Sequence, residues 1–259
     1  MEHPLIIISN KYLTPYKSGL NFDLQNALAA YNKLTKQDED FNFYIANAAV
    51  YSSNIEGNTI SFDTYLKSNE FNLHLKTKEL KEIEDLIIAY KFAQINKLTL
   101  ANILTAHELI TNNILKKKER GKIRKVQVGV RSEGKLIYLA IEPEYILSEL
   151  NKLIDDINIL ITAPLTIEEI FYYAAYIHLT FVNIHPFVDG NGRASRLIEK
   201  WFISQCTLIG NDAWFITSEK NYWNNRLAYY KNLQLGVNYY EVKYEKCVPF
   251  LLMLPNSLL

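Results

Sequence analysis

The sequence predicts an all-α fold that carries one β-hairpin. Apolar residues recur with helical spacing through most of the chain, and several of these segments begin at a residue able to cap a helix. Only between residues 120 and 141 do apolar and polar residues alternate as in a pair of strands. With 259 residues, of which 49% are apolar and 22% charged, the chain has the composition of a soluble globular protein and can bury a large core.

The predicted helices follow from this spacing and from their first residues. Ser61 and Thr99 can each accept a hydrogen bond from a free N–H group at a helix start. The run Thr166-Ile167-Glu168-Glu169 has the pattern of a capping box, and Pro143 suits a first helical turn. In chain order the segments are 22–35, 41–55, a short helix from 62, 78–94, 99 to about 115, 143 to about 158, 166–182, 194–205 and about 219–235.

The hairpin is predicted from alternation on both sides of a turn. Valines at 126, 128 and 130 alternate with polar residues, and apolar residues resume the alternation at 136, 138 and 140. Ser132-Glu133-Gly134 supplies the turn between them. The segment 241–259 shows no pattern that assigns it a structure.

Charge and cysteine content exclude several classes of protein. The formal net charge is zero, whereas a nucleic-acid-binding domain usually has a basic excess. Residues 116–125 are the nearest to a basic patch, and they leave nucleic-acid binding as a minor alternative. The two cysteines, Cys206 and Cys247, are not spaced like metal ligands and favour a reduced, cytoplasmic protein. The apolar stretch at 5–8 is too short to span a membrane.

Residues 185–196, His-Pro-Phe-Val-Asp-Gly-Asn-Gly-Arg-Ala-Ser-Arg, combine a proton acceptor, an acidic residue and anion-binding groups. The two glycines let backbone N–H groups approach a ligand, the asparagine between them adds an amide donor, and the following helix N-terminus favours an anion. Arg193 and Arg196 lie on one face of that helix and suit a polyphosphate. Asp189 can hold Mg²⁺ beside the phosphates. His185 can accept a proton near neutral pH, so the run predicts a base, a metal ligand and a phosphate site together.

Other motifs fit this chain less well. The run is neither a Walker loop nor a dinucleotide fingerprint, because the lysine of the first and the third glycine of the second are missing. His107-Glu108 begins like a zinc-protease motif, but Thr111 stands where the second histidine would be. His178 lies one heptad before His185, and we interpret it as a packing residue.

The run resembles the Fic motif, His-Pro-Phe-x-Asp/Glu-Gly-Asn-Gly-Arg-x-x-Arg, at every fixed position, and the resemblance extends from about residue 47 to 238. It implies a protein adenylyltransferase that moves AMP from ATP to a Ser, Thr or Tyr hydroxyl of a target protein, with His185 as catalytic base and Asp189 as Mg²⁺ ligand. The implied nucleotide-binding residues are Asp189, Gly190, Asn191, Gly192, Arg193, Arg196, Tyr229 and Tyr230. An asparagine that follows the tyrosine pair in the family lies one position later here, at Asn238.

Two further features are implied by the same resemblance. Family members with lysine at position 192 phosphorylate their targets, so Gly192 favours AMP transfer. The hairpin at about 121–141 resembles the flap that binds an extended target segment through its backbone edge. The strand expected to bind the target is formed by Val128, Gly129, Val130 and Arg131.

A second stretch, 52–58, resembles the Fic inhibitory motif, Ser/Thr-x-x-x-Glu-Gly/Asn, at Ser52, Glu56 and Gly57. A glutamate near a helix C-terminus is unfavourable for the helix dipole, which indicates a partner elsewhere. The resemblance implies that Glu56 pairs with Arg196 and blocks the γ-phosphate position. The expected organisation is an N-terminal extension at 1–75 with an inhibitory helix at about 41–57, a catalytic core at 76–240 and an unassigned segment at 241–259.

Several alternatives stay open. A Fic-type transferase could use UMP, GMP or phosphocholine donors, since the motif binds phosphates more than bases, and the same glutamate could support removal of AMP from a modified target. A non-catalytic nucleotide-binding interaction module is another hypothesis. Self-modification and a homodimer are further expectations, and no membrane partner is expected.

Overall fold

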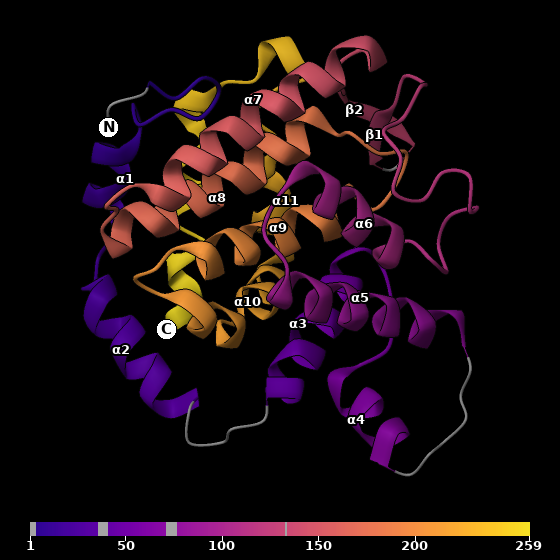
Figure 1. Ribbon diagram of the computed structural model, residues 1–259, viewed down its shortest axis with the longest axis horizontal. Helices are drawn as coiled ribbons and strands as arrows, with labels where there is room; N and C mark the ends of the chain where they lie inside the picture. Colours follow the sequence, from indigo (N-terminus) through magenta and orange to yellow (C-terminus); the bar gives the residue numbers. More distant parts are fainter. Residues whose placement is uncertain (1–3, 36–40, 71–76, 133) are drawn as a thin grey trace.

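The fold is helical with one two-stranded antiparallel sheet, so the predicted class is confirmed (Figure 1). The computed structural model describes residues 4–35, 41–70, 77–132 and 134–259. Its α-helices are α1 Leu13–Gly19, α2 Leu24–Thr35, α3 Phe41–Ile55, α4 Phe62–Glu70, α5 Lys78–Ile95, α6 Leu100–Ile110, α7 Pro143–Thr162, α8 Ile167–Ile184, α9 Asn191–Gln205, α10 Ser218–Asn224, α11 Arg226–Leu233 and α12 Val248–Leu251. The strands are β1 Gly129–Ser132 and β2 Lys135–Leu139, and the 3₁₀ helices are η1 Gly210–Phe215, η2 Tyr239–Glu241, η3 Tyr244–Lys246 and η4 Pro255–Leu258.

The capping residues begin helices where the sequence predicts. Thr166 accepts a hydrogen bond from the Glu169 N–H while the Glu169 carboxylate accepts one from the Thr166 N–H, which completes the capping box of α8. Thr99 caps α6 in the same way through the Asn102 N–H. The side chain of Ser61 accepts from the N–H of Thr64 at the start of α4.

Several bounds of the predicted helices differ from the structure. The segment predicted as one helix at 219–235 is two helices, α10 and α11, which meet at Asn225. Helix α6 ends at Ile110 rather than near 115, and α9 begins three residues earlier than predicted. Helix α1 was not predicted at all. The turn predicted at Ser132-Glu133-Gly134 includes Glu133, which lies outside the described residues.

The core is built around α8 and α9, which pack side by side near the centre of the molecule (Figure 1). Every residue of α8 from Ile170 to Phe181 is buried, as is nearly all of α9. Helix α3 packs against α5 and α10, and α5 packs against α6 and α9. One hydrophobic cluster includes residues from Ile8 to Leu258. The domain boundaries at 75/76 and 240/241 stay predictions.

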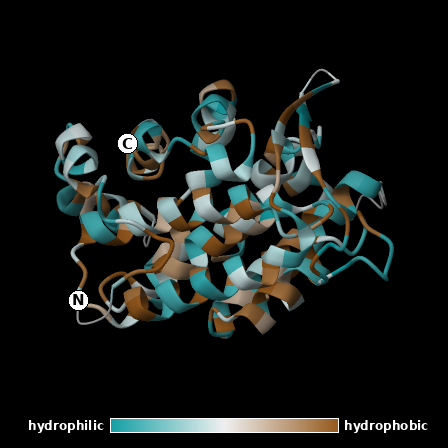
Figure 2. Ribbon diagram, turned by 90° about the horizontal axis from the view of Figure 1, so that it is seen from above, coloured by the Kyte–Doolittle hydropathy of each residue, from teal (hydrophilic) through white to brown (hydrophobic). Residues whose placement is uncertain are grey.

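The hairpin stands at one side of the helical body, opposite α1 and the C-terminus (Figures 1 and 2). The hydroxyl of Tyr138 in β2 donates to the carbonyl of Asn183 in α8 at 2.6 Å, so the hairpin is anchored near the end of that helix. Within the described residues, none of the helices combines the length and hydropathy needed to traverse a bilayer. Both cysteines are free thiols in buried positions.

Candidate active site

His185 stands where α8 ends and the chain turns sharply. It is the C-cap of the helix and has a left-handed backbone, with φ 52° and ψ 59°. Among the described residues other than glycine, it is the one residue with positive φ. A side chain with a Cβ is strained by about 1–2 kcal/mol in this conformation. The surrounding contacts must therefore hold His185 in place, as is common at functional sites.

The imidazole of His185 is prepared to accept a proton. Its Nδ1 lies 3.1 Å from the carbonyl oxygen of Val182. Because a carbonyl can only accept, Nδ1 carries the hydrogen and Nε2 is left with a free lone pair. The pKa of His185 is lowered to about 4, mainly by burial and to a lesser extent by the nearby Arg124 charge, against the opposing effect of the bond to Val182. The ring is thus neutral at physiological pH.

The loop after His185 is fixed by two side chains. Asn191 is 2% exposed, and its amide accepts from the N–H and donates to the C=O of Phe187, both at 2.9 Å. The amide thus holds the loop closed, and its predicted contact with phosphate stays a prediction. His107 stacks on the ring of Phe187 with 3.5 Å between centroids.

His107 also links the loop to a turn of distant sequence. Its Nδ1 accepts the N–H of Gly121 at 3.0 Å, so its Nε2 carries the hydrogen and donates to the carbonyl of Asp189 at 2.9 Å. Burial lowers the pKa of His107 to about 4 and keeps the ring neutral. The sequence offered His107 only as half of a zinc motif. Its role in holding the loop was missed.

Helix α9 directs its N-terminus at this loop. Its N-cap is Gly190, with φ 81°, and no side chain caps the helix. The uncapped N–H groups and the helix dipole favour an anion here. A Cβ at Gly190 would lie 2.8 Å from a methyl carbon of Thr111 and 3.2 Å from the ring of His107. Glycine is therefore required here both because there is no space for a Cβ and because φ is positive.

The two arginines of α9 are buried and paired with carboxylates. Arg196 is fully buried, and its Nη2 donates to Oε1 of Glu56 at 2.8 Å. Arg193 is 6% exposed, and its Nη2 donates to Oε2 of Glu82 on α5 at 3.3 Å. The Nε of Arg193 is buried without a partner among the described residues. Glu82 was not singled out from the sequence.

The end of α3 provides the partners of Arg196. Besides Glu56, Ser52 accepts from Nε of Arg196 through its hydroxyl at 2.9 Å and from Nη2 through its carbonyl at 3.0 Å. Gly57 follows with φ 96°, the left-handed residue expected just past a helix. Although burial opposes it, the charges of Arg196 and Arg193 hold the pKa of Glu56 below its usual value. A Cβ on Gly192 would overlap the carboxylate of Glu56.

The predicted tyrosine pair occupies two different environments. Tyr229 is buried, and its hydroxyl lies 3.1 Å from Nη1 of Arg196 and 3.0 Å from Nε2 of His178. Tyr230 is 45% exposed and donates to the carbonyl of Ile55 at 2.7 Å. The contact of either ring with adenine stays a prediction. The side chain of Asn238 accepts from the N–H groups of Tyr240 and Glu241, so it caps a local turn.

His178 does more than pack against its neighbours. Its Nδ1 lies 2.7 Å from Oε2 of Glu199, which also accepts from the hydroxyl of Tyr222 at 2.8 Å. Because a carboxylate accepts, Nδ1 carries the hydrogen, and Nε2 can accept from the hydroxyl of Tyr229. A buried chain of hydrogen bonds therefore runs from Arg196 through Tyr229 and His178 to Glu199. It fixes the guanidinium of Arg196 through Nη1, while Glu56 binds Nη2.

The hairpin has one covered and one open edge. In β2, the N–H of Leu139 donates to the carbonyl of Val237, and Leu139 forms a parallel bridge with Asn238. The register partner of Leu139 is Gly129 of β1, so the polar backbone groups of Gly129 face the opposite edge. This edge belongs to the segment predicted for target binding: Val128, Gly129, Val130 and Arg131. The strand itself begins one residue later than predicted, at Gly129.

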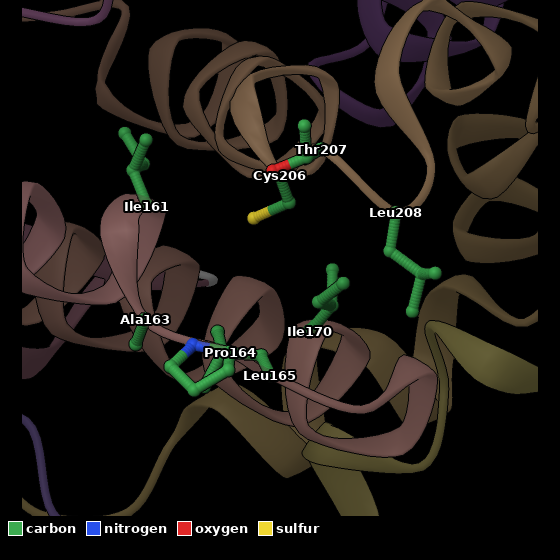
Figure 3. A pocket seen from close by; sticks show the side chains of 8 residues that line it. All are labelled: Ile161, Ala163, Pro164, Leu165, Ile170, Cys206, Thr207 and Leu208. Atoms are coloured by element: carbon green, nitrogen blue, oxygen red, sulfur yellow. The ribbon is translucent and has the colours of Figure 1, made fainter.

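Two further features are relevant to this site: possible metal ligands and a separate apolar pocket. No three His, Cys, Asp or Glu side chains gather into a metal-binding group within the described residues. The exposed carboxylate of Asp189 still suits Mg²⁺, which commonly takes one protein carboxylate together with phosphate oxygens and water. The pocket of about 300 Å³ in Figure 3 is lined mainly by apolar side chains, together with Cys206 and Thr207. It lies at the far ends of α8 and α9, about 20 Å along α8 from His185.

Comparison with known proteins connects this geometry to one family. Residues 97–203 match the model of the Fic/DOC family. Over 154 residues, 56% of this chain, the sequence is 32% identical to Protein adenylyltransferase fic-1 of Caenorhabditis elegans. It is 29% identical over 162 residues to Protein adenylyltransferase Fic of Drosophila grimshawi. The matched segments make up 28% and 30% of these relatives, so the chain spans under a third of their length.

Solved structures share the fold over nearly the whole chain. A Fic family protein from Desulfovibrio desulfuricans G20 superposes with a TM-score of 0.76 at 18% identity, covering 99% of this chain and 74% of that one. Fic-1 from C. elegans superposes with a TM-score of 0.66 at 19% identity, covering 95% of this chain and 71% of that one. At such low identity these likenesses establish the fold alone.

Proposed function

We propose that this chain, whose residues 97–203 match the Fic/DOC family model, transfers AMP from ATP to a hydroxyl side chain of a target protein. One observation supports this most directly. The free lone pair of His185 and the uncapped N-terminus of α9, with Arg193 and Arg196, belong to one continuous loop and helix. The curated relatives carry the name protein adenylyltransferase, which supports the same chemistry.

The proposed reaction uses the groups of this loop in fixed roles. The target hydroxyl oxygen forms a bond to the α-phosphorus of ATP, the bond from that phosphorus to pyrophosphate breaks, and the hydroxyl proton goes to Nε2 of His185. The α9 N–H groups, Arg193 and Arg196 stabilise charge on the phosphates. Asp189 would hold Mg²⁺, which when bound neutralises charge on the α- and β-phosphates. This is AMP transfer, and Gly192 rather than lysine supports it over phosphorylation.

The pairing of Glu56 with Arg196 supports a built-in inhibition. If Arg196 holds the γ-phosphate, the carboxylate of Glu56 competes for the same guanidinium at 2.8 Å. The open edge of β1 supports target binding by backbone pairing. The two reduced, buried thiols support a cytoplasmic protein. Self-modification and homodimer formation belong to the same proposal.

Label transfer tests the proposal. Purified protein is incubated with Mg²⁺ and ATP labelled at either the α- or the γ-phosphate, alone and in lysate. We expect Glu56→Gly to incorporate α-label above wild type and Glu56→Gly/His185→Ala to incorporate none. Glu84→Gly, which changes an exposed glutamate of α5, is the matched control and should stay at the wild-type level.

Other outcomes select other functions. Transfer of γ-label would make the protein a kinase, and mass spectrometry of labelled peptides identifies any donor other than ATP. Loss of label from a modified target upon addition of wild-type protein would indicate removal of AMP. ATP binding with no transfer by Glu56→Gly would leave a nucleotide-binding module and would overturn the proposal.

A further inference from the structure

Arg124 is buried although it belongs to the basic segment 116–125, whose composition is typical of a solvent-exposed surface. It is 3% exposed, while Lys122 and Lys125 on either side are exposed. Arginine is rarely buried unless its donors are paired. Each of the three side-chain nitrogens of Arg124 donates to a carbonyl oxygen, at the end of α8 or at the base of the hairpin.

The guanidinium of Arg124 binds three carbonyl oxygens. Its Nε donates to His185 at 2.8 Å, its Nη1 to Val126 at 2.8 Å and its Nη2 to Ile141 at 2.5 Å. Its backbone N–H donates to the carbonyl of Pro186 at 3.0 Å. Val126 and Ile141 flank the two ends of the hairpin, so one side chain closes the hairpin base and holds the strained residue at the end of α8.

This arrangement depends on the shape of the side chain as well as on its charge. Five N–H donors in a planar fork can serve three carbonyls at once, whereas a lysine ammonium is a single point on a flexible stem. The direction of the His185 carbonyl is set by ψ, one of the two backbone angles of the left-handed turn. A bond to that carbonyl therefore holds the backbone angles that direct the imidazole.

We propose that Arg124 is a positioning residue that fixes His185 for proton abstraction and joins it to the base of the target-binding hairpin. This inference rests on the proposed transferase function. Within the described residues, the hydrogen bonds of Arg124 reach neither the nucleotide loop beyond Pro186 nor the arginines of α9. Arg124 therefore affects the orientation of the catalytic base, His185, and the shape of the hairpin, whereas other residues bind ATP.

The test uses Glu56→Gly as the parent, with Arg124→Lys, Arg124→Ala and the exposed control Lys125→Ala added to it. Steady-state label transfer from ATP gives kcat and KM, and calorimetry gives the Kd of a non-hydrolysable ATP analogue. We expect kcat to fall about 10²-fold in both Arg124 variants, because a small misplacement of a reacting group has such an effect. KM and Kd for the nucleotide should stay within about twofold of the parent. Lys125→Ala should match the parent.

Chemical rescue distinguishes the effect of the planar guanidinium shape of Arg124 from the effect of its positive charge. Millimolar guanidinium should restore transfer by Arg124→Ala, and the same concentration of ammonium should not. An Arg124→Lys variant as active as the parent, or equal losses in nucleotide affinity and kcat, would overturn the proposal.

A structural measurement decides the inference even if no transfer occurs. If the parent variant Glu56→Gly transfers no label, the proposed transferase function fails, but the positioning role of Arg124 can still be tested. Hydrogen exchange at the Ala140 amide, which bonds to Val128 at the hairpin base, and the ring ¹⁵N signals of His185 are then compared between parent and Arg124→Lys. Faster exchange together with shifted ring signals supports the positioning role. Unchanged exchange and unchanged signals refute it.

Discussion

Oε1 of Glu56 accepts a hydrogen bond from Nη2 of Arg196 at 2.8 Å, across 140 residues of sequence, and thereby joins the end of α3 to α9. The two partners differ in burial, because Arg196 is fully buried while the side chain of Glu56 is 28% exposed. Arg196 keeps its bonds to Ser52 and Tyr229 if Glu56 moves away. These bonds can therefore hold the guanidinium in place without the carboxylate of Glu56.

The Glu56–Arg196 pair should make stability depend on pH in the acid range. The folded-state pKa of Glu56 lies below its ordinary value of 4.5, so its stabilising effect is complete above about pH 4.5 and is lost as pH falls through the folded pKa. We expect Glu56→Gln to lower the free energy of unfolding by about 1–3 kcal/mol at pH 7, with a difference that shrinks below pH 4.5. Urea unfolding at a series of pH values measures this. A difference that grows on acidification contradicts it.

His185 should not titrate in the usual histidine range. Because burial lowers its pKa to about 4, the ring stays neutral and able to accept a proton well below pH 6.5. We expect kcat/KM for label transfer by Glu56→Gly to change little between pH 8 and pH 5, since kcat/KM reports the free enzyme. In an NMR pH titration, the ring carbon signal of His185, assigned by its absence in His185→Ala, should likewise show no titration midpoint near pH 6.5. Such a midpoint would exclude a base whose pKa is lowered in this way.

The two neighbouring tyrosines should differ in their contribution to stability. Tyr229→Phe removes a hydroxyl between two buried groups, Arg196 and His178, and should lower the free energy of unfolding by about 1–3 kcal/mol. Tyr230→Phe removes a single bond to Ile55 at a half-exposed position and should cost about 0.5–1.5 kcal/mol. Each variant is the other's control, because both lose one hydroxyl. Equal losses would show that the buried chain of hydrogen bonds adds nothing beyond the loss of one hydroxyl.

His107 should matter through its hydrogen bonds more than through its ring. His107→Phe keeps an aromatic ring against Phe187 but loses the bonds to Gly121 and Asp189. We expect a loss of about 1–3 kcal/mol in stability and weaker binding of an ATP analogue, because the loop before α9 is no longer held. Calorimetry and urea unfolding test both effects. Nucleotide affinity equal to wild type would show that the loop keeps its shape without His107.

Local sequence signals predicted the elements wherever several of them agreed. Thr99 and Thr166 begin helices because a capping hydroxyl and an apolar period coincide there. The break at Asn225 was missed because residues 219–235 contain neither glycine nor proline. Helix α10 packs against α3, whereas α11 packs against α12, so two packing partners divide a segment whose local pattern is continuous.

The sequence by itself determined the helical class, the hairpin and the contiguous loop from His185 to Arg196, because these follow from spacing and chemistry within a few residues. Apart from the pairing of Glu56 with Arg196, which the motif resemblance implied, only the tertiary structure decided the partners of the site residues. Arg124 binds His185 across 61 residues, and His107 binds Asp189 across 82. Such contacts depend on how helices pack and which way side chains point, and a basic or histidine-containing segment has no local feature that encodes this.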